Sequence, residues 1–281
     1  MVTPSCGPRG IVPPYDGKDR RIYLKGASQV FQLIQTARQA QNMKGNDNQR
    51  TTPVTVLLLA LAIEGTLGAA VDTASDTWTA QKLSSLCDVM RRRLQTWCAG
   101  MFEVPDFIWN RVDPLDPNAA LRTKIIWEVA YLQHTARDFI ESQSVWGMLL
   151  KRTDTKFDPY MSLIQSTVFL YKVAVPLVNN PLVFGLFRKG LLEPALYALL
   201  FAERAEETTG EAHLEVLEEL DNFMTRHLIR WIGDYPGHWS RLLDVAGAPN
   251  TFYSFVDLAV FYRLHQFYPC KDRLGLRPVS Q

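Results

Sequence analysis

The sequence offers few arrangements of titratable side chains that could perform catalysis. His227 and His238 lie eleven residues apart, but a break from Gly233 to Pro236 separates them, which favours packing or capping histidines over a metal pair. A group of six carboxylates follows a helical pattern and indicates a solvated face with negative charge near a helix N-terminus, not an acid–base pair. The group comprises Glu206, Glu207, Glu211, Glu215, Glu218 and Glu219.

The common catalytic motifs are absent from the sequence. There is no GxSxG, no GxxxxGK[ST], no GxGxxG after a strand, no HExxH and no EF-hand loop. The four cysteines, Cys6, Cys87, Cys98 and Cys270, form no CxxC pair and no cluster with zinc-ligand spacing. We therefore expect buried free thiols in a reducing, cytoplasmic setting, with no enzymatic activity, no cofactor and no metal.

The densest basic run is Arg91-Arg92-Arg93, with Trp97 one turn beyond it. Successive helical residues point about 100° apart, so at most two of these arginines share a face. A solvated helix side is the plainer interpretation, and a patch for phosphates or for an acidic helix is the alternative. The formal net charge of +1 argues against a strongly basic nucleic-acid binder, although it leaves room for a basic groove on an otherwise acidic body.

Large side chains with polar groups form a row near the C-terminus. Phe223, His227 and Trp231 are spaced four residues apart, Tyr235 continues the row, and Phe252-Tyr253 follows after a polar gap. Such a row suits a groove that holds an apolar peptide segment. It equally suits an amphipathic helix packed on its neighbours.

These residues resemble a pattern of the TorD-type chaperones of molybdoenzyme maturation. That family carries a phenylalanine, then His-Leu-x-x-Trp, then an aromatic residue, then Phe-Tyr at the start of the final helix. The resemblance covers the C-terminal third of this chain. The family's Glu-Pro-x-Asp-His segment is matched at Glu193-Pro194-Ala195, but Leu196 and Tyr197 replace the Asp-His pair, which puts the function of that segment in doubt.

The resemblance implies a cytoplasmic, all-helical, non-catalytic chaperone. It would hold the signal peptide of a molybdenum-containing redox enzyme during maturation, with acidic side chains meeting the arginines of the peptide. The peptide-binding residues would be Glu193, Tyr197, Phe223, His227, Trp231, Tyr235, Phe252 and Tyr253.

A second hypothesis is a structural assembly subunit, such as a helical nucleoprotein or coat protein. It would oligomerise through an extended N-terminal arm and bind RNA phosphates. The phosphate-binding residues would then be Arg91, Arg92, Arg93, Arg122, Lys124, Lys151 and Arg152.

The elements that must position these residues are predicted to be helices. Prolines and glycines dominate residues 1–26, which indicates an extended arm. Residues 27–268 show helical periodicity and predict an all-α bundle of about ten helices, with a possible division into two lobes near 153–158 and a tail at 269–281. The most apolar run, Val54 to Ile63, is too short for a membrane span and indicates a buried helix.

Particular residues predict where several helices begin and end. Asp76 or Thr77 should cap one helix, and Asn118 should begin a long helix that reaches Ile140. Pro159 should open another helix. Further helices should run from Glu211 to Ile232 and from about Thr251 to Phe267.

Overall fold

The computed structural model describes residues 17–42, 51–64, 78–104, 119–153, 157–177, 192–210, 213–232, 238–242, 254–262 and 264. Within these ranges ten α-helices, two short 3-10 helices and three short strands form, which confirms the all-α class. The elements in chain order are α1 (Gly17–Asn42), β1 (Thr51–Thr55), α2 (Val56–Ile63), α4 (Ala80–Trp97), β2 (Phe102–Glu103), α5 (Ala119–Ile125), β3 (Glu128–Tyr131), α6 (His134–Glu141), α7 (Gln143–Leu150), α8 (Pro159–Ala174), η3 (Val175–Leu177), α10 (Glu193–Thr209), α11 (Leu214–Ile232), η5 (Trp239–Leu242) and α12 (Phe255–Phe261).

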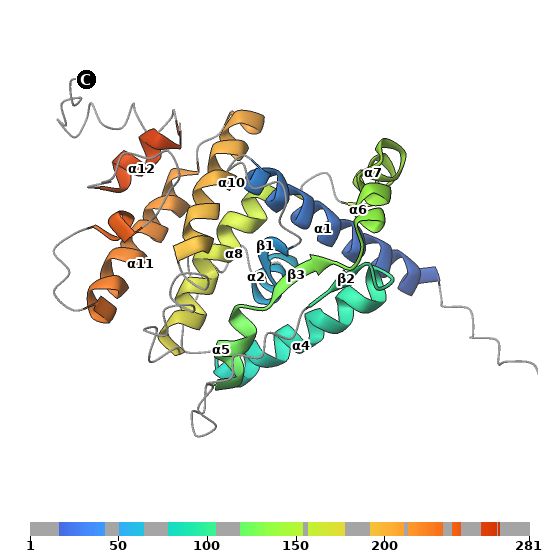
Figure 1. Cartoon of the computed structure of the whole chain (residues 1–281), viewed down its shortest axis with the longest axis horizontal. Helices are drawn as coiled ribbons and strands as arrows, with labels where there is room; N and C mark the ends of the chain where they lie inside the picture. Colours follow the sequence, from blue (N-terminus) through green and yellow to red (C-terminus); the bar gives the residue numbers. More distant parts are fainter. Residues whose placement is uncertain are drawn as a thin grey trace, which may run out of the picture.

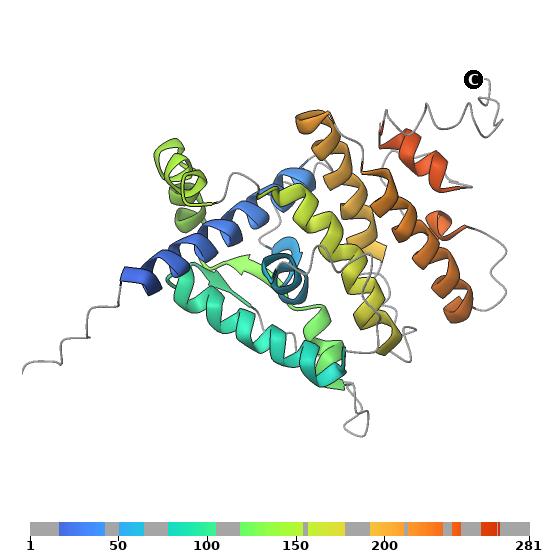
Figure 2. The same ribbon diagram turned by 180° about the vertical axis from the view of Figure 1, so that it is seen from behind.

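Helix α2 forms the centre of the core. Its residues from Val56 to Ala62 are all buried, because the helix carries apolar side chains on every face and needs neighbours all round. It packs against α1, α4 and α8, which surround it in both views of the molecule (Figures 1 and 2). Thr55 caps its N-terminus by accepting a hydrogen bond from the Leu58 backbone N–H at 3.2 Å.

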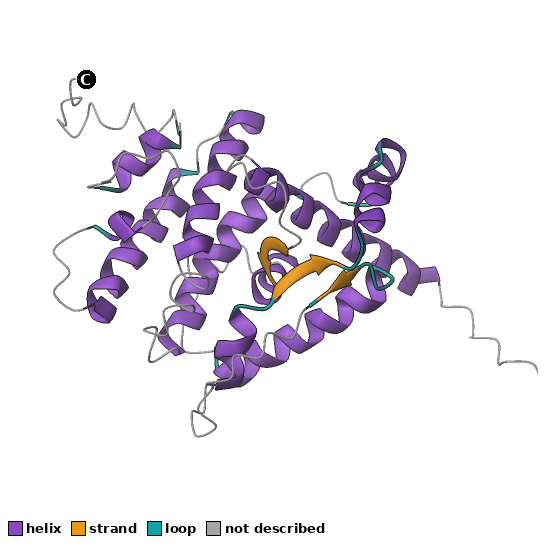
Figure 3. Ribbon diagram, viewed as in Figure 1, coloured by secondary structure: helices purple, strands orange, loops and turns teal. Residues whose placement is uncertain are grey.

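A three-stranded antiparallel sheet lies beside α2, in the order β1-β3-β2 (Figure 3). The prediction of one long helix from Asn118 to Ile140 was wrong, because β3 interrupts it and leaves α5 and α6 as separate short helices. Val129 and Tyr131 favour a strand, and β3 finds partners on both sides: Phe102 pairs with Tyr131, and Thr55 pairs with Glu128. Pro53 fits β1 because an edge strand can spare one N–H donor.

The boundary expected for the N-terminal arm was also wrong. Helix α1 begins at Gly17, not after Gly26. No proline follows Pro14 until Pro53, so every backbone N–H from Gly17 onward is available for helical bonds. Gly26 lets α1 approach α4 closely, since a Cβ there would lie 2.5 Å from the Trp97 ring. Residues 1–16 and the predicted tail at 269–281 lie outside the described residues.

Helix α8 begins at Pro159, as predicted, and other helices end at local caps. Asp158 caps α8 and accepts hydrogen bonds from the N–H groups of Tyr160 and Met161, with Pro159 at the first helical position. Gly210 ends α10 with φ 72°. The cap of α4 was predicted at Asp76 or Thr77, but Thr79 takes that role, with its hydroxyl accepting from Lys82 N at 3.2 Å.

The two sides of the predicted division at 153–158 share one hydrophobic core. Helix α8, which follows the division, packs against α1 and α2, which precede it. At one end of the molecule lie α11 and α12, and at the other lie α6 and α7 (Figure 1). Among the described residues, no helix has both the length and the apolar character that crossing a membrane requires.

Candidate functional site

The C-terminal aromatic row begins inside the core. Phe223 is 7% exposed, and its ring centroid lies 5.6 Å from that of Tyr171. His227 stacks on Phe223 at 3.9 Å, and its Nδ1 lies 3.1 Å from the Phe223 carbonyl oxygen. His227 is half-buried, so its side chain is more accessible to solvent than that of Phe223. Trp231 belongs to α11 without a described side chain, and Tyr235, Phe252 and Tyr253 lie outside the described residues.

Two further residues of the predicted peptide site lie on α10. Glu193 opens this helix, and Tyr197 follows one turn later with its ring stacked on Phe201 at 6.2 Å. Burial raises the pKa of Tyr197 to about 12, and the negative charge of Glu193 acts in the same direction. The structure thus brings together Glu193 with Tyr197, and Phe223 with His227, on two helices that each pack against α8.

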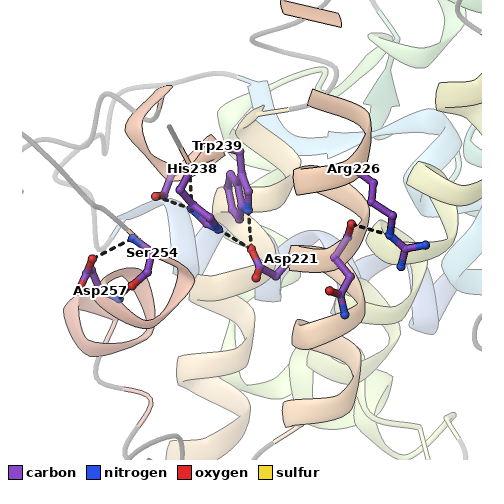
Figure 4. A network of polar contacts seen from close by, with 8 residues as sticks. Asp221, Arg226, His238, Trp239, Ser254 and Asp257 are labelled. Atoms are coloured by element: carbon purple, nitrogen blue, oxygen red, sulfur yellow. Dashed lines mark hydrogen bonds and ion pairs between the residues drawn. The ribbon is translucent and has the colours of Figure 1, made fainter. Parts of the chain in front are cut away.

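A polar network that the sequence did not reveal joins α11 to η5 (Figure 4). His238 Nε2 lies 2.8 Å from Asp221 Oδ1, and Trp239 Nε1 donates to the same oxygen at 2.7 Å. His238 Nδ1 lies 2.7 Å from the Ser240 hydroxyl and also accepts from the Ser240 backbone N–H at 3.2 Å. An Asp–His–Ser chain can serve as a proton relay, but Ser240 is fully buried. The network therefore anchors the turn that contains Trp239.

The first turn of α12 is closed in the same region by a capping box (Figure 4). Ser254 N–H donates to Asp257 Oδ2 at 2.9 Å, and Asp257 N–H donates to the Ser254 hydroxyl at 3.3 Å. These bonds satisfy two donors at the helix end. Ser254 and Asp257 therefore have a structural role.

Most of the described cations on α4 and α5 engage neighbouring side chains. Lys124 pairs with Asp88 at 2.6 Å and donates to the Ser84 hydroxyl at 2.8 Å. Arg91 lies 5.2 Å from the centroid of the Trp127 ring. These contacts link α4 to the segment that contains α5 and Trp127.

The other basic residues of the predicted phosphate site are distributed over separate elements. Arg93 pairs with Glu64 and lies over the Trp97 ring, whereas Arg92 is exposed. Lys151 and Arg152 are exposed after α7, which lies on the opposite side of α1 from α4 (Figure 1). The side chain of Arg122 is outside the described residues. The described members therefore do not form one contiguous groove.

An exposed apolar surface lies on and beside α6 and α7. Four large side chains define it: Leu132 (45% exposed), Phe139 (57%), Met148 (59%) and Leu150 (49%). We call these four residues the α6–α7 surface. Helix α7 has no buried residue, although five of its eight residues are large and apolar. Met148 and Leu150 are therefore apolar side chains of α7 that the rest of the described chain leaves exposed.

The other side of α7 is attached to the body of the molecule. Val145, Trp146 and Leu149 pack partly against the core. Gln32 of α1 donates to the Thr153 hydroxyl at 2.9 Å just beyond α7. Arg38 of α1 pairs with Glu141 at 3.1 Å at the end of α6. Contacts to α1 therefore anchor the chain just before α7 begins and just after it ends. The run Val145-Trp146-Gly147-Met148-Leu149-Leu150 was the sequence signal that could have identified it.

Cys87 and Cys98 are free and buried, as predicted. Burial raises the pKa of the Cys87 thiol to about 12, despite the opposing positive charge of Lys124. Burial also raises the pKa of Cys98. Both thiols are therefore protonated near neutral pH and poor nucleophiles. Within the described part of the chain, no group of three or more His, Cys, Asp or Glu side chains is placed to hold a metal ion.

Comparison with known proteins identifies one sequence family. The family model described as "Domain of unknown function (DUF7791)" matches residues 20–180. This range includes the core helices α2, α4 and α8 and the α6–α7 surface, whereas the C-terminal aromatic row lies beyond it. No curated protein and no solved structure matches the chain.

Proposed function

The chain belongs to the DUF7791 family. We propose that this protein is non-catalytic and binds an apolar segment of a partner protein. The observation that carries this proposal is the α6–α7 surface. Among the described residues, seven large apolar side chains are prominently exposed, and four of them belong to the stretch from Leu132 to Leu150. Apolar side chains concentrated in this way gain free energy when a partner covers them.

Two further observations support a binding role. The α6–α7 surface lies inside the range matched by the family model, so it belongs to the part of the chain that defines the family. The buried thiols Cys87 and Cys98 and the buried hydroxyl of Ser240 are inaccessible to a substrate. These reactive groups therefore offer no support for a catalytic function.

A peptide-binding measurement tests the proposal. The probe is a fluorescent peptide of about 14 residues, uncharged, with leucines at helical spacing. We expect it to bind the full chain in fluorescence anisotropy and to bind the double variant Phe139→Gln/Met148→Gln roughly tenfold more weakly. Each truncated contact should remove about half of the ~1.5–3 kcal/mol that full burial of such a side chain provides.

Val260→Gln is the matched control, because Val260 is an exposed apolar residue on α12, far from the α6–α7 surface. This variant should bind the peptide like the unmodified chain. Circular dichroism should give the same helical content for all three proteins. Equal binding by the double variant and the control, or no binding by the unmodified chain, would refute the proposal.

The finer proposal, a signal-peptide chaperone of the TorD type, is supported by a different observation. Glu215 and Glu218 are exposed on α11 and form no ion pair with the other described residues. By contrast, Glu219 pairs with Lys172 at 3.1 Å and Glu207 pairs with Arg204. Two carboxylates that no described residue pairs with, on the helix that carries His227, could meet the arginines of a signal peptide.

A twin-arginine peptide followed by an apolar stretch tests this second candidate. We expect Glu215→Gln/Glu218→Gln to weaken its binding several-fold at low salt, because two favourable charge contacts are lost. The same peptide with glutamines in place of the arginines is the control and should bind both proteins equally. If both peptides respond alike to the substitutions, α11 does not recognise the arginines.

A further inference from the structure

Two exposed cations lie next to the α6–α7 surface. Lys151 and Arg152 follow Leu150 directly, and both are exposed. Neither forms an ion pair with another described residue. The acidic side chains of α6 are already compensated, since Glu141 pairs with Arg38 and Asp138 pairs with Arg137, each at 3.1 Å. The apolar surface therefore ends at two exposed cations that no described acidic residue pairs with.

We propose that the occupant of the α6–α7 surface is an amphipathic, helix-forming segment of another protein that carries acidic side chains beside its apolar ones. This inference rests on the proposed function and adds the charge of the partner. The apolar side chains of the segment cover Phe139, Met148 and Leu150, and its carboxylates meet Lys151 and Arg152. Such complementarity contributes mainly to specificity and to the rate of association.

The same charges disfavour a second copy of this chain as the occupant. A symmetric dimer places the same surface of both subunits face to face. Lys151 and Arg152 of either copy would then meet a partner surface on which the described acidic residues, Asp138 and Glu141, are already paired. Phosphates could meet the two cations, but a polyanion would leave Phe139 and Met148 uncovered.

Lys151 also has a local role that the experiment must separate from partner binding. It is the C-cap residue of α7, where a cation interacts favourably with the helix dipole. Loss of that interaction would lower the stability of α7 without any partner. The effect of charge reversal is therefore measured as the ratio of the affinities for two peptides. A change in the stability of α7 alone would not alter that ratio.

Two fluorescent peptides with identical apolar residues serve as probes, one flanked by glutamates and the other by lysines. We expect the full chain to bind the glutamate peptide at least fivefold more tightly at about 50 mM salt, and this preference to shrink at about 300 mM because salt screens exposed charges. Lys151→Glu/Arg152→Glu should reverse the preference. The control Arg92→Glu/Arg226→Glu changes the net charge equally at exposed sites on α4 and α11 and should preserve it.

Each result supports or overturns the inference. Equal binding of both charged peptides would overturn the inference, and so would a control variant that behaves like Lys151→Glu/Arg152→Glu. In either case the proposed function stands if the uncharged peptide still binds. Binding of no peptide would overturn both. Dimerisation in light scattering that is lost in Phe139→Gln/Met148→Gln would identify a second copy as the occupant. Binding of a single-stranded RNA probe that depends on Lys151 and Arg152 but not on Phe139 would identify a nucleic acid instead.

Discussion

One carboxylate oxygen of Asp221 accepts from Trp239 and lies 2.8 Å from a nitrogen of His238. We predict that Asp221→Ala lowers the free energy of unfolding by roughly 2 kcal/mol, because it leaves the buried Trp239 N–H without an acceptor. Urea unfolding followed by tryptophan fluorescence measures this loss. Glu218→Ala, at an exposed position of the same helix, should change stability by less than about 0.5 kcal/mol. A similar loss in both variants would mean that the network contributes little to stability.

The buried thiol of Cys87 makes stability depend on alkaline pH. The folded thiol keeps its proton up to about pH 12, whereas an unperturbed thiol has a pKa of 9.0. Above pH 9 the unfolded state therefore binds fewer protons, so the free energy of unfolding falls as the pH rises toward 12. We predict that Cys87→Ala makes this fall shallower by roughly 1 kcal/mol per pH unit. Urea unfolding between about pH 8 and about pH 10.5 compares the two slopes; identical slopes would contradict the prediction.

At the scale of elements, two glycines allow a matched test of helix geometry. Gly210 ends α10 with φ 72°, whereas Gly147 lies within α7, and a Cβ at either position would meet no atom within 4 Å. We predict that Gly210→Ala destabilises the protein by about 1 kcal/mol, because alanine is strained in the left-handed region. Gly147→Ala should stabilise it by about 0.5–1 kcal/mol. Thermal unfolding should show opposite shifts, and shifts of the same sign would contradict this explanation.

The small sheet shows why the prediction of elements was incomplete. Strand β3 is four residues long, too short for alternation to distinguish it from the apolar stripe of a helix. It forms because Thr51–Thr55 and Phe102–Glu103, which are distant in the sequence, supply backbone partners on both sides. By contrast, Pro159 acts within its own helix, so the sequence predicted the start of α8 correctly.

At the scale of the whole molecule, charge distribution separates the two broad hypotheses. The net charge is +1, and Lys124 and Arg93 are paired with Asp88 and Glu64. We predict that the purified protein elutes in size-exclusion chromatography as a monomer or small oligomer. The ultraviolet absorbance of this peak should be that of protein without bound nucleic acid. A high-mass particle with strong nucleic-acid absorbance and salt-sensitive RNA binding would favour the assembly subunit.

The sequence alone determined the helical class, the burial of Val56 to Ala62 and the buried state of Cys87 and Cys98. Those properties follow from periodicity, apolar composition and the low polarity of a thiol, all of which act locally. Only the tertiary structure decided that Phe223 faces the core while Phe139 and Met148 face outward. Both sets of residues are apolar and follow helical spacing. Which of them is covered depends on the neighbours that chain packing supplies, and the sequence of one helix does not contain that information.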